Sequence, residues 1–212
     1  MNPIFQSILR EEFDYQILQD ALADYSRPRD KIRNLIKKKE IIRVKKGLYV
    51  LGDGHRKRPY SRELLANLIY GPSYVSLEYA LSYHGLIPER VESVTSVTCG
   101  KNRSFQTPIG RFTYWFVPLV YYWIGFDVIE TENDIRFLMA TPEKALSDKL
   151  LHDRKTNIRH QADMEAYLLD DLRLEEKDLQ NLNVERIETC ARHIHSRKLN
   201  TLLDYFRERG KT

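Results

Sequence analysis

The amino-acid sequence predicts an α+β fold, with an N-terminal winged helix-turn-helix followed by a mixed α/β C-terminal domain that ends in helices. Three observations predict it. A basic amphipathic helix and a basic hairpin occupy residues 26–50, short β-branched and aromatic stretches lie between residues 91 and 139, and helical periodicity returns after residue 141. The length of 212 residues suits one or two domains.

The basic helix is expected to begin at Ser26, a common N-cap residue, with Pro28 in its first turn. Its apolar residues recur at helical spacing and mark a buried side, formed by Ile32, Leu35 and Ile36. On a helical wheel the opposite side carries Arg33, Asn34, Lys37 and Lys38. The helix therefore presents a positively charged outer face with an amide in its middle.

A basic hairpin follows this helix. Residues 41–45 alternate as a short strand, Lys46 and Gly47 turn the chain, and residues 48–50 bring it back. Two shorter helices are expected earlier, one near residues 4–9 and one capped by Asp14. The hairpin residues expected to close the core of these three helices are Ile42, Val44, Leu48 and Val50. This order is that of a winged helix-turn-helix, whose second paired helix enters the DNA major groove.

Charge is segregated along the chain. Between Arg27 and Arg62 there are fourteen Lys or Arg residues and three acidic ones, a net charge of +11, whereas the whole chain carries +4. The remaining residues therefore sum to −7. A positive segment on an otherwise acidic chain indicates a polyanionic partner for that segment, and Lys and Arg contacts to phosphates supply most non-specific affinity for nucleic acid.

The residues expected to contact double-stranded DNA are Arg27, Arg29, Lys31, Arg33, Asn34, Lys37, Lys38, Arg43, Lys45 and Lys46. Within this set, Arg33 and Lys37 have the donor geometry for guanine edges, and Asn34 suits an adenine. The phosphate contacts, which position without specifying sequence, are assigned to Arg27, Lys31, Arg43, Lys45 and Lys46.

A linker rich in glycine and charge ends near residue 59, so the expected domains are residues 1–59 and 60–212. The second domain is expected to open with two helices, one over residues 61–70 and one capped by Ser76. A β region follows Pro88: a loop or hairpin at residues 101–111, an aromatic strand at 112–117, and two strands pairing across the turn at 132–134.

The sequence Thr141-Pro142-Glu143 combines a capping hydroxyl, a first-turn proline and an acid near the positive end of the helix dipole, which predicts a helix start. From about Arg159, three helices are expected in a charged context, forming a helical tail from about residue 156.

Catalytic and cofactor motifs are missing from the sequence, so we expect neither an enzyme nor a bound cofactor or metal. His193 and His195 are two residues apart, and a helix directs such side chains away from each other. Cys99 and Cys190 lack metal-ligand spacing and fit reduced thiols in the cytoplasm. No membrane partner is expected, because the longest apolar stretch is short and contains Pro118.

The aromatic segment Phe112–Phe126 allows two interpretations. Its aromatic side chains, with Arg103 and Arg111 nearby, suit stacking of single-stranded RNA bases. The favoured interpretation places alternate aromatics in the core and the remainder at a protein interface, such as that of a homodimer.

Three blocks follow one another along the chain: the turn Lys46-Gly47-Leu48-Tyr49, the block from Gly71 to Leu86 (GPSYVSLEYALSYHGL), and the helix start from Pro142 to Leu146 (PEKAL). Taken in this order, the three blocks resemble the AbiEi family of antitoxins. The resemblance covers residues from about 10 to 155.

The resemblance implies a transcriptional autorepressor that binds its own promoter, often at inverted repeats. It also implies an antitoxin in an abortive-infection system, opposing a nucleotidyltransferase-like toxin without a stable complex. The alternatives are an RNA-binding antitoxin module and a stand-alone transcriptional regulator.

Overall fold

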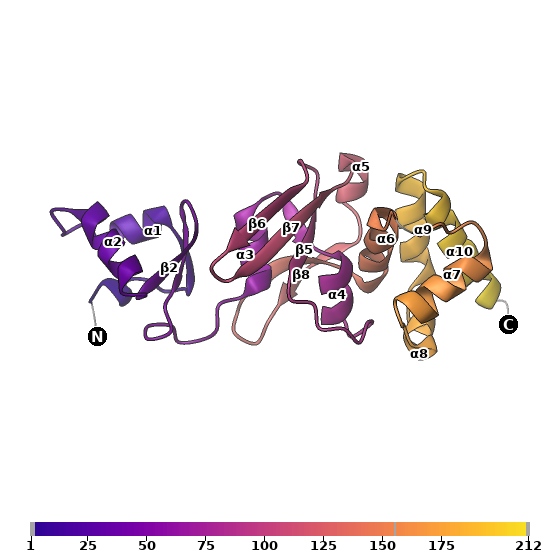
Figure 1. Cartoon of the computed structure of the whole chain (residues 1–212), viewed down its shortest axis with the longest axis horizontal. Coiled ribbons are helices and arrows are strands. Elements are labelled where there is room, and N and C mark those ends of the chain that lie inside the picture. Colours follow the sequence, from indigo (N-terminus) through magenta and orange to yellow (C-terminus); the bar gives the residue numbers. More distant parts are fainter. Residues whose placement is uncertain (1–2, 155, 211–212) are drawn as a thin grey trace.

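A computed structural model describes residues 3–154 and 156–210, and it is a mixed α+β structure with two sheets, as the sequence predicts. Along the long axis a small N-terminal part, a six-stranded sheet and a group of C-terminal helices follow one another (Figure 1). Helix α6 (Pro142–His152) lies between the sheet and the last helices. No helix in the described ranges has the length and apolar content needed to cross a membrane.

The N-terminal part combines short helices with a three-stranded antiparallel sheet of order β1-β3-β2. Its elements are η1 (Pro3–Phe5), β1 (Glu12–Asp14), α1 (Tyr15–Asp20), α2 (Pro28–Lys37), β2 (Ile41–Lys45) and β3 (Leu48–Leu51). The helix expected near residues 4–9 is only the single 3₁₀ turn η1, after which Leu9 is 90% exposed. The predicted cap Asp14 accepts a hydrogen bond from the Ile17 amide at 2.9 Å.

The β2–β3 hairpin is apolar on both faces, which corrects one expectation from the sequence. Ile42, Val44, Leu48 and Val50 do not close the N-terminal core, because they pack into the large core formed with the second sheet. The N-terminal core is closed instead by Ile41, Tyr49 and Leu51. All four residues of β3 are buried, so both faces of the hairpin are covered, and the face with Val44, Leu48 and Val50 packs in the larger core.

Buried acids fix the N-terminal sheet to the chain that leaves it. Glu12, whose side chain is fully buried, pairs with Arg58 through two hydrogen bonds of 2.9 and 3.2 Å and also accepts from the Ser61 amide. Glu11 pairs with the same guanidinium at 3.1 Å. Two carboxylates on one Arg satisfy these buried charges and hold the segment before α3 (Arg62–Ile69) against β1.

The second sheet has the order β6-β7-β5-β4-β9-β8. Its strands are β4 (Ser73–Val75), β5 (Val94–Thr98), β6 (Arg103–Thr107), β7 (Gly110–Phe116), β8 (Phe126–Glu130) and β9 (Arg136–Ala140). The associated helices are α3 (Arg62–Ile69), α4 (Leu77–Tyr83) and α5 (Leu119–Tyr122). The expected pairing of β8 with β9 is confirmed. The loop or hairpin expected at residues 101–111 is part of a longer hairpin, in which β6 pairs with the aromatic strand β7.

Helices cover both faces of this sheet. Successive strand residues point to opposite faces, so Tyr74 and Val75 lie on different sides of β4. The Tyr114 hydroxyl donates to the Ala66 carbonyl of α3 at 2.7 Å, whereas the Tyr74 hydroxyl donates to Asp148 of α6 at 3.1 Å. Thus α3 packs on one face, and α4 and α6 pack together on the other.

The helical tail contains more elements than the three helices expected. They are α7 (Gln161–Ala166), the π-helical turn η2 (Tyr167–Asp171), α8 (Glu176–Gln180), α9 (Val184–His193) and α10 (Arg197–Arg209). Its apolar residues join the large core of the sheet. Buried Glu143 of α6 accepts a hydrogen bond from the Asn183 amide at 2.9 Å, which fixes the start of α9 against α6.

Candidate nucleic-acid interface

Helix α2 presents the two faces that the sequence predicts. Ile32 and Leu35 are buried in the N-terminal core, and Ile36 packs against that core. On the opposite side Arg33, Asn34, Lys37 and Lys38 are all exposed. The core thus fixes the rotation of the helix about its axis and directs these side chains to solvent.

The charged groups on this face are held only weakly. Arg33 Nη1 lies 3.5 Å from Asp30 Oδ1, with side chains 81% and 56% exposed. Exposed ion pairs of this kind contribute about 0–1 kcal/mol, so a phosphate or a base can replace the carboxylate. The Lys31 ammonium lies 5.0 Å from the centre of the Tyr25 ring, which holds that side chain near the start of the helix.

A hollow of about 390 Å³ lies where α1 meets the beginning of α2. It is lined by Tyr15, Gln19, Arg27, Pro28, Arg29, Asp30 and Arg33. Sequence reasoning missed the two residues from α1, Tyr15 and Gln19, because only tertiary packing brings them beside α2. The Arg27 side chain does not cap the helix, so the amides of Arg29 and Asp30 at its start have no side-chain cap.

The hairpin divides its basic residues between two environments. Arg43 and Lys46 are exposed. Lys45 is half-buried, and its ammonium donates to the Ile69 carbonyl at the end of α3. Burial lowers the pKa of Lys45. The structure therefore brings Arg43 and Lys46 to the surface but directs Lys45 toward the second sheet, away from a phosphate backbone.

A buried polar cluster between the second sheet and α6 is the other concentration of reactive groups. Lys144 Nζ lies 3.2 Å from Asp148 Oδ1, and both side chains are fully buried. Asp148 Oδ2 also accepts from the Ser76 hydroxyl at 2.6 Å, and Lys144 donates to the Tyr121 carbonyl at 3.1 Å. Burial lowers the pKa of Lys144. These buried groups join α6 to β4 and α5 through the hydrogen bonds to Tyr74 and Tyr121.

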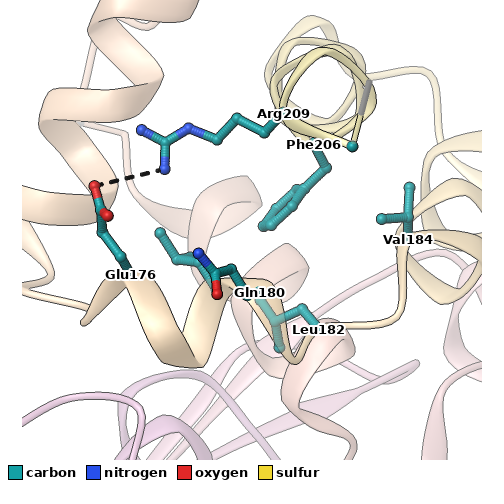
Figure 2. Close-up of a pocket in the computed structure, with 8 residues that line it drawn as sticks. Glu176, Gln180, Leu182, Val184, Phe206 and Arg209 are labelled. Atoms are coloured by element: carbon teal, nitrogen blue, oxygen red, sulfur yellow. Dashed lines mark ion pairs between the residues drawn. The ribbon is translucent and has the colours of Figure 1, made fainter. Parts of the chain in front are cut away.

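The helical tail contains a hollow of about 450 Å³ between α8, α9 and α10 (Figure 2). Leu179, Leu182, Val184 and Phe206 line it, and an ion pair joins Arg209 and Glu176 across it at 3.9 Å. An apolar lining with one exposed ion pair provides neither a nucleophile nor an acid–base pair. Within the described part of the chain, no group of His, Cys, Asp and Glu side chains is placed to hold a metal ion.

Comparison with models of protein families gives no match for this sequence. A search of curated proteins gives no match either. The evidence for function is therefore the geometry and charge of the chain's own residues.

Proposed function

We propose that this protein is a DNA-binding transcriptional regulator, whose residues 1–59 form a winged helix-turn-helix. The observation that supports the proposal most directly is the outer face of α2: four polar or charged side chains exposed together, on a helix whose other side is fixed in a core. In this proposal α2 is the recognition helix and the β2–β3 hairpin is the wing.

The dimensions fit a recognition helix. Helix α2 has 10 residues, a length of about 15 Å at the usual rise, and the major groove is about 12 Å wide. With the outer face of α2 in the groove, Arg33 and Lys37 reach guanine edges and Asn34 reaches an adenine.

Phosphate contacts flank this helix. Arg27, Arg29 and Lys31 lie at its beginning, and exposed Arg43 and Lys46 extend the positive surface onto the hairpin. Lys45 is left out of the proposed interface, because its ammonium is bonded to the Ile69 carbonyl. The phosphate contacts give affinity, whereas the side chains in the groove give sequence preference.

The resemblance to AbiEi antitoxins supplies the proposed biological setting. The protein would repress its own operon in the cytoplasm, and it would oppose a nucleotidyltransferase-like toxin encoded beside it. A gene for such a protein directly downstream, whose toxicity is relieved by co-expression of this chain, is the expected finding. A toxin that remains fully active on co-expression would contradict the antitoxin role and leave the regulator role standing.

Gel shifts with duplexes from the region upstream of the gene test DNA binding. Arg33→Ala is expected to lose about 1–3 kcal/mol of preference for the specific duplex over random duplex, because it removes a base contact. Lys46→Ala is expected to weaken binding to both duplexes alike. It should also reduce the magnitude of the negative slope of log K against log salt by about 0.9, because one phosphate contact is lost.

Lys177→Ala is the matched control, because it removes the same charge from an exposed position on α8. It should bind as the unchanged protein does. Equal losses on specific and random duplex for both Arg33→Ala and Lys46→Ala would reject the assignment of roles, and an equal loss for Lys177→Ala would reject the interface itself.

A further inference from the structure

The outer strands β6 and β7 leave one sheet face uncovered. Side chains alternate along β7, so Arg111, Thr113 and Trp115 lie on the side away from α3. On the paired strand β6, Ser104 lies opposite Thr113 and Gln106 lies opposite Arg111. Thr113 is half-buried and the other four are exposed, Trp115 at 36%. Phe112 and Tyr114, which alternate with them, are buried against α3. Only part of the aromatic segment is therefore core.

Two hollows follow this face and share Arg111. One, of about 320 Å³, is lined by Asn102, Arg103, Ser104, Arg111, Thr113, Tyr114 and Trp115. The other, of about 580 Å³, lies at the beginning of β7 and includes Arg62, Arg90 and Arg111, with Glu92 as its one acid. From Gly110 to Trp115 the strand extends about 17 Å at the usual rise. The hollows thus align Arg62, Arg90 and Arg111 along this face, whereas Arg103, opposite Tyr114, lies on the other face of β6.

The charge of this face is not neutralised. Residues 93–126 contain no Asp or Glu, and their charged residues are Lys101, Arg103 and Arg111. Among the residues that the structure describes, no acidic side chain pairs with Arg103 or Arg111. Unpaired guanidinium groups beside an exposed aromatic ring suit a ligand that carries both phosphates and flat bases.

Trp115 is held in place for stacking. The His152 ring of α6 lies 5.4 Å from the Trp115 ring, centre to centre, at an angle of 38°. This contact supports one side of the indole at the border between the covered and uncovered parts of the sheet. The rest of the indole remains exposed to solvent, where a base can stack on it.

We propose that the β6–β7 face, from Arg62 and Arg90 through Arg111 to Trp115, binds single-stranded RNA. Bases stack on Trp115, and the arginines pair with the phosphates. The hydroxyl and amide side chains of Ser104, Gln106 and Thr113 lie between these groups, where they pair with 2′-hydroxyls and favour RNA over DNA. This site is separate from α2, so it stands or falls independently of duplex DNA binding.

Fluorescence of Trp115 tests the proposal directly. The chain has two tryptophans, and the full-length Trp123→Phe variant leaves Trp115 as the only one. An oligouridine decamer is expected to quench its emission, whereas a thymidine DNA decamer binds more weakly. Failure of RNA to quench, or equal binding of the DNA decamer, would overturn the proposal.

Substitutions separate stacking from charge. Trp115→Ala is expected to weaken RNA binding about 5- to 150-fold, the range for loss of one stacked base. Arg111 is exposed, so Arg111→Ala leaves the core intact. This variant is expected to reduce the magnitude of the negative slope of log K against log salt by about 0.7. Far-UV circular dichroism checks that both variants remain folded.

Two controls locate the site. Lys177→Ala should bind RNA unchanged, and Trp115→Ala should retain duplex DNA binding. If Arg33→Ala on α2 reduced RNA binding as much as Arg111→Ala did, the RNA would lie on the helix and the proposed face would be wrong. If neither Trp115→Ala nor Arg111→Ala changed RNA affinity, the proposal would also fail.

Discussion

Gly52, directly after β3, lies against the backbone that connects α2 to β2. Its amide donates to the Glu40 carbonyl at 2.8 Å, and a Cβ built on it would overlap the carbonyl oxygen of Lys39. Because that atom belongs to the backbone, it has no rotamer by which to move away. Gly52→Ala is therefore expected to lower the free energy of unfolding by about 1–3 kcal/mol, as overpacking does. Urea-induced unfolding measures it.

Gly54→Ala is the matched control for this prediction. A Cβ at Gly54 meets no atom within 4 Å, and Gly54 is not among the residues with positive φ. Its urea midpoint should therefore stay at or slightly above that of the unchanged protein, since Ala restricts the unfolded chain. Identical midpoints for Gly52→Ala and the unchanged protein would show that the backbone around Gly52 accommodates the added Cβ without loss of stability.

Single residues at helix starts are well predicted where a side-chain hydroxyl or carboxylate caps the helix. Asp14 and Thr141 accept hydrogen bonds from the amides of Ile17 and Lys144, as expected. Ser61, where the sequence predicted only the beginning of a helix, accepts one from the Leu64 amide. The expected cap at Ser26 is wrong, because the N-cap of α2 is Arg27. The cause is Pro28: the residue before a proline is disfavoured in helical conformation, so Arg27 is the last non-helical residue.

At the scale of elements, the sequence predicts the hairpin but not its orientation. All four residues of β3 are buried, so periodicity alone does not show which alternate pair faces the N-terminal core. The orientation of the hairpin depends on the second sheet, which is distant in sequence, because Val44, Leu48 and Val50 pack in the same core as that sheet. The same long-range packing draws Lys45 away from the interface, which no pattern within residues 41–50 reveals.

The link between β1 and α3 gives a prediction about element docking. The Glu12 carboxylate accepts hydrogen bonds from Arg58 and from the Ser61 amide. In Glu12→Gln, the side-chain NH₂ group would face these donors and could accept no hydrogen bond from them. The loss is expected to be about 1.5–3 kcal/mol, the usual value for hydrogen bonds to a charged group. Trypsin should then cleave faster after Arg56 or Lys57, because proteolysis follows local opening.

Glu132→Gln removes the same charge from the exposed turn between β8 and β9 and serves as the control. Its cleavage rate should match that of the unchanged protein. Equal rates for Glu12→Gln and Glu132→Gln, measured by mass spectrometry of the fragments, would show that the buried carboxylate does not hold the two elements together.

For the whole molecule, charge segregation and helical periodicity together predicted the exposed basic face of α2. The sequence did not reveal the hollow that joins Tyr15 and Gln19 to that face, because it depends on contacts between elements. The aromatic segment with Arg111 was one of two interpretations of the sequence, but the addition of Arg62 and Arg90 to it also depends on contacts between elements. Alternate aromatics were expected in the core, and this is confirmed for Phe112 and Tyr114. Exposed Trp115, on the opposite face of β7, also fits this expectation, whereas Phe116 departs from it, because it shares the face of Phe112 and Tyr114 but is exposed at the end of the strand.

The large core should make the protein sensitive to alkali. Burial raises the pKa of Tyr122 to about 12, and it raises the pKa of Tyr74, Tyr114 and Tyr121 as well. Between pH 10 and about 12, tyrosines of the unfolded chain lose protons that the folded chain retains, so stability falls as pH rises through this window. These residues lie in β4, β7 and α5, so their ionisation should coincide with cooperative loss of circular dichroism. Tyr122→Phe should make the decline shallower. Phenolate absorbance that rises fully while the circular dichroism stays intact would contradict a core built on these tyrosines.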